Sequence, residues 1–225
     1  MMRESIEQNG FAIIPSVISC SEIDDLINSL EKLAVRSKAG ARHLMKHLSV
    51  NALAYDKRML TIARSVLGNS AIPFRATLFD KSSTANWLVV WHQDTALPLR
   101  EITKSAGWGP WSVKDYVFNT HAPTEALNTV LALRIHLDDS TSVNGPLRVI
   151  PGTHKHGVLT DSEVGQLAAE SQSVECIVSK GGVVAMRPLI IHASSKSSSD
   201  IPRRVIHIEY ASSLAITNDH QLAIA

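Results

Sequence analysis

The residues Trp91-His92-Gln93-Asp94 place a histidine and a carboxylate two positions apart, and a second histidine, His192, follows far along the chain. Residues i and i+2 of a β-strand point the same way, so His92 and Asp94 can bind one ion while Gln93 faces elsewhere. Two imidazoles and one carboxylate on one face of an octahedral ion form the site that holds non-haem Fe(II) and leaves three positions open. The pattern therefore indicates an iron oxygenase.

The spacing alone does not select this pair. The chain also contains His136-Leu137-Asp138 and His207-Ile208-Glu209, which have the same two-residue separation. Short motifs of this kind need support from their surroundings.

The surroundings of His92 supply that support. The chain contains WHQDTALPL at 91–99, NGPLRVIPGTHKHG at 144–157, RPLIIHASS at 187–195 and PRR at 202–204. Together these blocks resemble the phytanoyl-CoA dioxygenase family, from about Phe11 to about Tyr210. The resemblance implies Fe(II), 2-oxoglutarate as cosubstrate and O2.

The resemblance also implies roles for individual residues. The metal ligands, which are the catalytic residues, fall on His92, Asp94 and His192, and the arginine that binds 2-oxoglutarate falls on Arg203. Gln93 and Ser194 match family positions that contact the iron site or the cosubstrate.

The strand expected at 131–138 alternates, with Arg134, His136 and Asp138 on its polar face. The resembling family places cosubstrate contacts on this strand, which makes Arg134 a candidate for the cosubstrate and His136 one for the substrate. The family commonly has an aromatic residue where Arg134 falls, and a solvated polar face is the alternative.

Two adjacent arginines compete for one role. Arg203 shares a face with Val205 and His207, whereas Arg204 shares one with Ile206 and Ile208. Apolarity would turn Arg204 inward, but the family register turns Arg203 inward. We follow the register and expect the Ile206 face to pack beneath helices.

Further candidates for substrate contacts are Arg75, Arg187, Trp108 and Trp111. The tryptophans belong to the long segment 95–128, which has no sustained period. A connection of that length in a compact domain usually has a function, such as a lid over the substrate. The alternatives are a surface segment whose tryptophans fill an apolar crevice, and a surface ion pair for Arg187.

The remaining sequence predicts the fold. A length of 225 residues suits one domain, 1–225. Helices are expected from Ser19 to Ala34 and from Val50 to Leu67. Short strands are expected at 11–14, 72–79, 87–92, 129–137, 146–150, 174–178, 183–186 and 205–210. Many short strands suggest a sandwich or jelly roll, and the resemblance implies the double-stranded β-helix, a cupin-like jelly roll that is mainly β with supporting helices.

Composition and charge limit the kinds of partner that the protein can bind. A net charge of +1 and a pI near 7.9 provide no basic stripe for nucleic acid. The two cysteines, Cys20 and Cys176, make a disulfide framework improbable, and no apolar stretch suits a leader or a membrane span. We expect a cytoplasmic enzyme with a small-molecule substrate and no membrane or nucleic-acid partner.

The resulting hypothesis is a dioxygenase that hydroxylates a small, polar or anionic metabolite and releases succinate and CO2. Related enzymes also desaturate, cyclise or cleave. Two alternatives remain open at this point: a cupin-type metalloenzyme that needs no 2-oxoglutarate, and a non-catalytic jelly roll that binds a small molecule.

Overall fold

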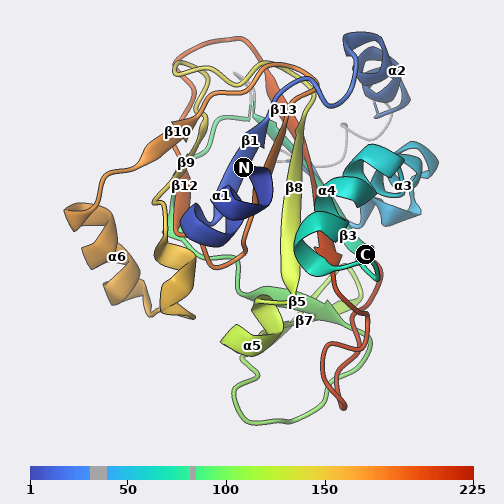
Figure 1. The fold of residues 1–225 in the computed structure, drawn as a ribbon, viewed down its shortest axis with the longest axis vertical. Helices are drawn as coiled ribbons and strands as arrows, with labels where there is room; N and C mark the ends of the chain where they lie inside the picture. Colours follow the sequence, from blue (N-terminus) through green and yellow to red (C-terminus); the bar gives the residue numbers. More distant parts are fainter. Residues whose placement is uncertain (31–39, 82–84) are drawn as a thin grey trace.

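The protein, described by a computed structural model over residues 1–30, 40–81 and 85–225, is built around two antiparallel sheets that form a jelly roll (Figure 1). The larger sheet has the order β1 (Phe11–Ile14), β11 (Val183–Met186), β8 (Val130–His136), β13 (Arg203–Ala211), β3 (Ile72–Lys81), β2 (Gly40–Ala41). The smaller sheet has the order β10 (Val174–Cys176), β9 (Leu147–Val149), β12 (His192–Ser194), β4 (Val89–His92).

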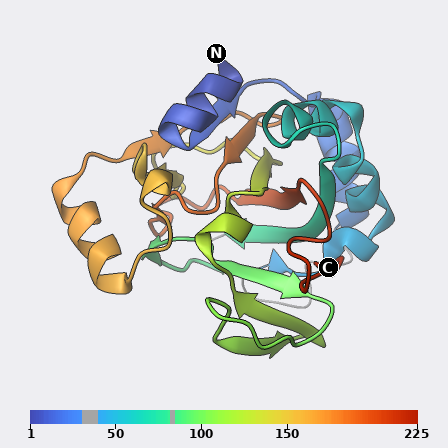
Figure 2. The same ribbon diagram turned by 60° about the horizontal axis from the view of Figure 1, so that its bottom comes forward.

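Four helices cover one face of the larger sheet (Figures 1 and 2). They are α1 (Met2–Asn9), α2 (Cys20–Leu30), α3 (Leu48–Ala54) and α4 (Lys57–Leu67). Their buried side chains form one core with Ile206, Ile208 and Tyr210 of β13. The expected packing of the Ile206 face beneath helices is therefore correct, and the opposite face of the strand is left for the interior of the barrel.

A third sheet lies beside the barrel and occupies most of the segment in which a lid was considered. It has the order β5 (Ala96–Leu99), β7 (Val117–His121), β6 (Trp111–Lys114), and Figure 2 shows it as a separate layer. The C-terminal segment holds this sheet in place: Leu222 bridges Leu99, and the His220 ring stacks on Trp108 with centroids 4.0 Å apart. Part of the segment is thus regular structure, and its apolar side chains share a core with Phe74, Val130 and Ala211 of the larger sheet.

The expected strands are present, with bounds that differ by at most two residues at either end. The expected helix from Val50 to Leu67 is wrong in one respect, because it is two helices separated at Tyr55 and Asp56. Asp56 ends the continuity by acting as an N-cap, since its side chain accepts a hydrogen bond of 2.8 Å from the Arg58 backbone N–H. The end of the first expected helix, at Leu33 and Ala34, lies outside the described residues.

Several short elements were not expected. They are α1, α5 (Thr124–Leu127), α6 (Asp161–Glu170), the 3₁₀ turns η2 (Leu44–Lys46) and η3 (Thr153–His156), and the strands β2, β5, β6, β7 and β12. Helix α6 begins at a capping box formed by Thr160 and Glu163, a pattern that is visible in the sequence. Among the described residues, no helix combines the length and apolarity that crossing a membrane requires.

Asp56→Ala removes the cap of α4 and should lower the free energy of unfolding by about 1 to 2 kcal/mol. Urea denaturation followed by circular dichroism measures the change. Asp25→Ala, on an exposed face of α2, serves as the control and should change stability by less than about 0.5 kcal/mol. Equal stability of the two variants would show that Asp56 does not hold the break between α3 and α4.

Candidate metal centre and adjoining cavities

The three predicted metal ligands meet at one end of the smaller sheet. His92 ends β4, Asp94 lies two residues beyond it, and His192 begins β12 directly opposite His92 in the strand register. The Nε2 atoms of His92 and His192 lie 3.7 and 3.5 Å from the two carboxylate oxygens of Asp94. Their ligand atoms all lie within 4.8 Å of one another, so one ion can contact all three.

Hydrogen bonds on the far side of each ring select the ligand nitrogen. His92 Nδ1 lies 2.8 Å from the carbonyl oxygen of Val90, and His192 Nδ1 lies 2.9 Å from that of Ile190. A carbonyl accepts only from a protonated Nδ1, so in its neutral form each ring presents an unprotonated Nε2 to the centre. Such partners orient metal-binding imidazoles and increase their basicity.

The charge states also suit a divalent ion. Burial lowers the pKa of His192 to about 4, against the attraction of Asp94, so the ring is neutral at physiological pH. Burial acts to raise the pKa of Asp94, but the surrounding basic groups, His192 first, hold it below the ordinary range. The centre therefore offers two imidazole rings and one carboxylate, which is the set that Fe(II) takes.

Gln93 braces the loops around the centre. Its Nε2 donates to the carbonyl oxygens of Gly157 and Leu189 at 2.9 and 2.8 Å, and its Oε1 accepts from Leu159 N at 2.9 Å. These three contacts satisfy most of the amide. Gln93 lies on the wall of the larger cavity described below.

A small cavity of about 100 Å³ lies on one side of the metal centre, inside the barrel. Its basic residues are Arg203, Arg134 and Lys81, and Ser194 connects two of them. Ser194 Oγ accepts from Lys81 Nζ at 2.8 Å and from Arg203 Nη2 at 3.2 Å. The structure thus brings the predicted Arg203, Ser194 and Arg134 together and adds Lys81.

Some buried N–H donors of the cationic side chains in this cavity have no hydrogen-bond partner within the part of the chain that the structure describes. Among the described residues, Arg203 Nη1 and Arg134 Nε have no hydrogen-bond partner. Burial, followed by the repulsion of Arg134, lowers the pKa of Arg203 to about 10, and burial with repulsion from Arg203 and Arg134 lowers that of Lys81 to about 8. Buried donors and uncompensated positive charge suit a dicarboxylate such as 2-oxoglutarate.

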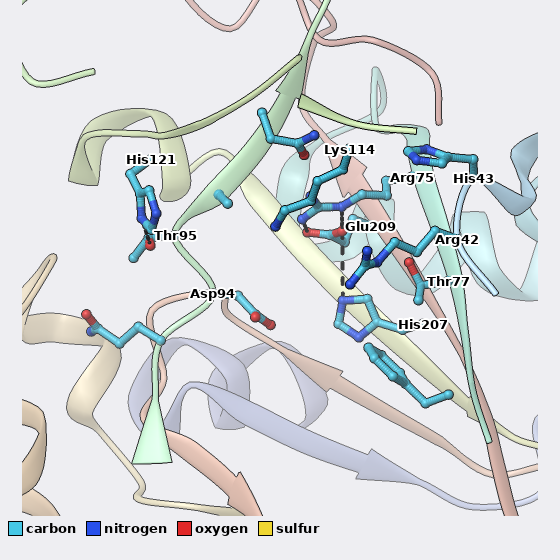
Figure 3. Close-up of a pocket in the computed structure, with 14 residues that line it drawn as sticks. Arg42, His43, Arg75, Thr77, Asp94, Thr95, Lys114, His121, His207 and Glu209 are labelled. Atoms are coloured by element: carbon cyan, nitrogen blue, oxygen red, sulfur yellow. Dashed lines mark hydrogen bonds and ion pairs between the residues drawn. The ribbon is translucent and has the colours of Figure 1, made fainter. Parts of the chain in front are cut away.

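A larger cavity of about 270 Å³ lies on the other side of Asp94 (Figure 3). Its wall carries an ion pair in which Arg75 donates from Nε and Nη2 to the carboxylate of Glu209. Burial lowers the pKa of Arg75, but Glu209 more than offsets this and raises it. Arg75, a predicted substrate contact, is therefore a charged part of this wall.

A row of polar side chains connects the two cavities. Glu209 Oε2 lies 3.9 Å from His207 Nε2, and His207 Nδ1 lies 3.2 Å from Arg134 Nη1. Since arginine can only donate, Nδ1 accepts and the proton of His207 is on Nε2, facing Glu209. Burial and Arg134 lower the pKa of His207 to about 3, so the ring is neutral.

The other substrate candidates lie away from both cavities. Trp108 and Trp111 pack against an apolar cluster that includes Leu97, as in the crevice-filling alternative. Arg187 donates to the carbonyl oxygens of Asn128 and Val130. His136 is fully buried, and neither ring nitrogen has a partner among the described residues.

Several lining residues were not selected from the sequence. Lys81, Arg42 and Lys114 are the basic ones. A signal existed for Lys81, because Arg75, Thr77, Phe79 and Lys81 alternate along β3, and all four line one or other cavity. Arg42 and Lys114 carry no such pattern.

The family model for phytanoyl-CoA dioxygenase (PhyH) matches residues 6–205. The chain belongs to this family. It is accordingly a non-haem iron, 2-oxoglutarate-dependent dioxygenase, and the residues of the metal centre and the small cavity fit iron and 2-oxoglutarate.

Two relatives agree with this assignment by their names, and one solved structure agrees with the fold. Ectoine dioxygenase from Bordetella bronchiseptica is 23% identical over 93% of this chain and 74% of its own. L-Proline trans-4-hydroxylase from Streptomyces griseoviridis is 28% identical, over 50% of this chain and only 51% of its own length. The structure of AviO1 from Streptomyces viridochromogenes superposes with a TM-score of 0.68 at 22% identity, covering 99% of this chain and 96% of that one.

Replacing any one of His92, Asp94 and His192 by alanine should reduce Fe(II) affinity by about 100-fold or more, since loss of a partner that only orients a ligand already costs 10- to 100-fold. Anaerobic titration with Fe(II) measures the change. His156→Ala, an exposed histidine outside the cavities, is the control. Wild-type affinity in Asp94→Ala would remove the carboxylate from the metal centre.

Proposed function

We propose that this dioxygenase hydroxylates a small polar or anionic metabolite, with release of succinate and CO2. The observation that carries the proposal is the position of Asp94, which lies on the wall of both cavities. A cosubstrate in one cavity and a metabolite in the other would both lie next to the same metal ion. Bound iron and 2-oxoglutarate supply the oxidising power that transfers an oxygen atom from O2 to the metabolite.

The small cavity would hold 2-oxoglutarate through its two ends. Arg203 and Lys81, both of which donate to the Ser194 hydroxyl, would bind the far carboxylate, and Arg134 would add a charge from the neighbouring strand. Planar guanidinium groups pair with carboxylates through two parallel hydrogen bonds. The arrangement argues against a metalloenzyme that works without an anionic cosubstrate, because such an enzyme would gain nothing from three buried cations.

The large cavity would hold and orient the metabolite. Its lining contains amide, hydroxyl, imidazole and charged side chains, with Phe79 as its aromatic member. Its volume is at the small end of ligand cavities, which span about 300 to 1,000 Å³. A long acyl chain would leave this polar surface without partners, whereas a small polar metabolite would satisfy it.

The relatives support hydroxylation as the outcome. Two of them are named for oxygenation of ectoine and of L-proline, which are small polar molecules. The test is succinate formation by the purified protein with Fe(II), 2-oxoglutarate and a panel of metabolites that begins with these two. We expect one metabolite to stimulate succinate formation and to gain one oxygen atom, as measured by mass spectrometry. Oxidation of a metabolite without consumption of 2-oxoglutarate would instead favour the cosubstrate-independent alternative.

Arg203→Ala should weaken 2-oxoglutarate binding by about 2 to 4 kcal/mol, or roughly 30- to 1000-fold, because it leaves a carboxylate without its charged partner in a desolvated cavity. The adjacent arginine provides a matched control. Arg204 pairs with Asp138 at 2.7 and 2.8 Å on the other face of the strand, so Arg204→Ala should leave the affinity unchanged. Anaerobic calorimetry with iron present compares the two, and a reversed result would place the wrong face of β13 in the barrel.

The pH dependence of 2-oxoglutarate binding should report on Lys81. In the absence of 2-oxoglutarate, the Lys81 amine has a pKa of about 8, lowered by burial and by repulsion from Arg203 and Arg134. A bound carboxylate favours the protonated form, so the affinity should be pH-independent below about 8 and fall by up to about tenfold per pH unit above it. Lys81→Met should bind more weakly and show a flatter profile between pH 7 and 9. An unchanged slope in Lys81→Met would assign the titration to another group.

A further inference from the structure

Three basic side chains from three separate elements converge on the larger cavity. Arg75 belongs to β3, Lys114 ends β6, and Arg42 directly follows β2. Figure 3 shows all three directed into the space across from Asp94. The cavity therefore has a metal-binding side and a basic side.

The acidic groups of the wall do not balance this charge. Asp94 belongs to the metal centre, and Glu209 is engaged by Arg75. Within the described parts of the chain, neither Arg42 nor Lys114 forms an ion pair. Asp115, which follows Lys114, is exposed and lies 3.6 Å from His43 Nε2. Two positive charges thus face the cavity without a counter-ion among the residues that the structure describes.

The ion pair with Glu209 fixes the orientation of the Arg75 guanidinium on the basic side of the cavity. Glu209 accepts from Nε and Nη2 of Arg75, which leaves Nη1 outside the pair. A guanidinium fixed on one edge presents its remaining N–H groups in a defined orientation. Clefts lined by one sign of charge also concentrate ligands of the opposite sign.

Building on the proposed function, we propose that the metabolite is an oxyanion, a carboxylate or a phosphate, and that Lys114 and Arg42 bind its charged group. Arg75 contributes Nη1 from the wall, and the carbon to be oxidised extends from the charged group toward Asp94. Lys114 is supplied by the third sheet and Arg42 by the edge of the barrel, so the site requires both parts of the fold.

The test uses inorganic phosphate and acetate as probes of the anion site and does not depend on turnover. The protein is loaded with Zn(II) in place of iron and with 2-oxoglutarate, which occupies the smaller cavity. Its lysines are dimethylated with ¹³C, a change that keeps their charge, and each signal is followed by NMR. Lys114→Ala assigns the signal of Lys114, and exposed Lys104, which lies outside the cavity lining, is the internal control.

We expect the Lys114 signal to shift and saturate with at least one probe while the Lys104 signal does not. Arg42→Ala should weaken that binding by roughly 10- to 150-fold, in the range for hydrogen bonds to charged groups. Arg64→Ala, an exposed arginine on α4, should leave it unchanged. Tighter binding of phosphate identifies a phosphorylated metabolite, and tighter binding of acetate identifies a carboxylate.

Two results would overturn the proposal. One is a Lys114 signal that moves no more than that of Lys104, and the other is a saturable shift that Arg42→Ala leaves unaltered, which would place the probe at the metal. Failure of the proposed function looks different. In that case the anion titration succeeds, but no carboxylate or phosphate in the panel stimulates succinate formation.

Discussion

Concentrated positive charge in a desolvated barrel is the constraint on which the rest of the structure depends. Arg203, Arg134 and Lys81 are buried side by side, and the described residues offer them hydroxyl, carbonyl and imidazole partners instead of a paired carboxylate. Such an arrangement opposes folding unless other contacts compensate. The apolar core beneath the four helices supplies that compensation, and it allows the interior face of the same sheet to be polar.

The larger sheet has a polar face inside the barrel and an apolar face beneath the helices, and much of this arrangement could be predicted from the sequence. Strand periodicity separates Ile206 and Ile208 from Val205 and His207, although it does not say which set faces the barrel. Apolarity alone gives the wrong answer, because the interior near the metal is polar while the helix-covered face forms the main core. The family register resolved the choice for Arg203, and the structure places its side chain in the cavity with Ser194.

The rest depended on contacts that a linear pattern does not contain. Arg42 and Lys114 are far apart in sequence and meet only because the third sheet docks beside the barrel edge. Tyr55 and Asp56 lie within a run of good helix periodicity, where a single side-chain cap is enough to separate two helices. For Trp108 and Trp111 the sequence left a lid over the substrate and the filling of an apolar crevice equally open, and both side chains pack against the apolar cluster that includes Leu97.

Strand β3 connects the two cavities as well as forming part of the larger sheet. Its alternate residues Arg75, Thr77, Phe79 and Lys81 face the ligand side, with Arg75 in one cavity and Lys81 in the other. The strand separates these two residues by about 20 Å, at about 3.3 Å per residue. If the proposed assignment of the two cavities holds, substitutions at the Arg75 end would change which metabolite is oxidised, while the Lys81 end would keep its contact with 2-oxoglutarate. Inserting or deleting one residue between them would turn one end away from its ligand, so the strand should accept new side chains far more readily than a new length.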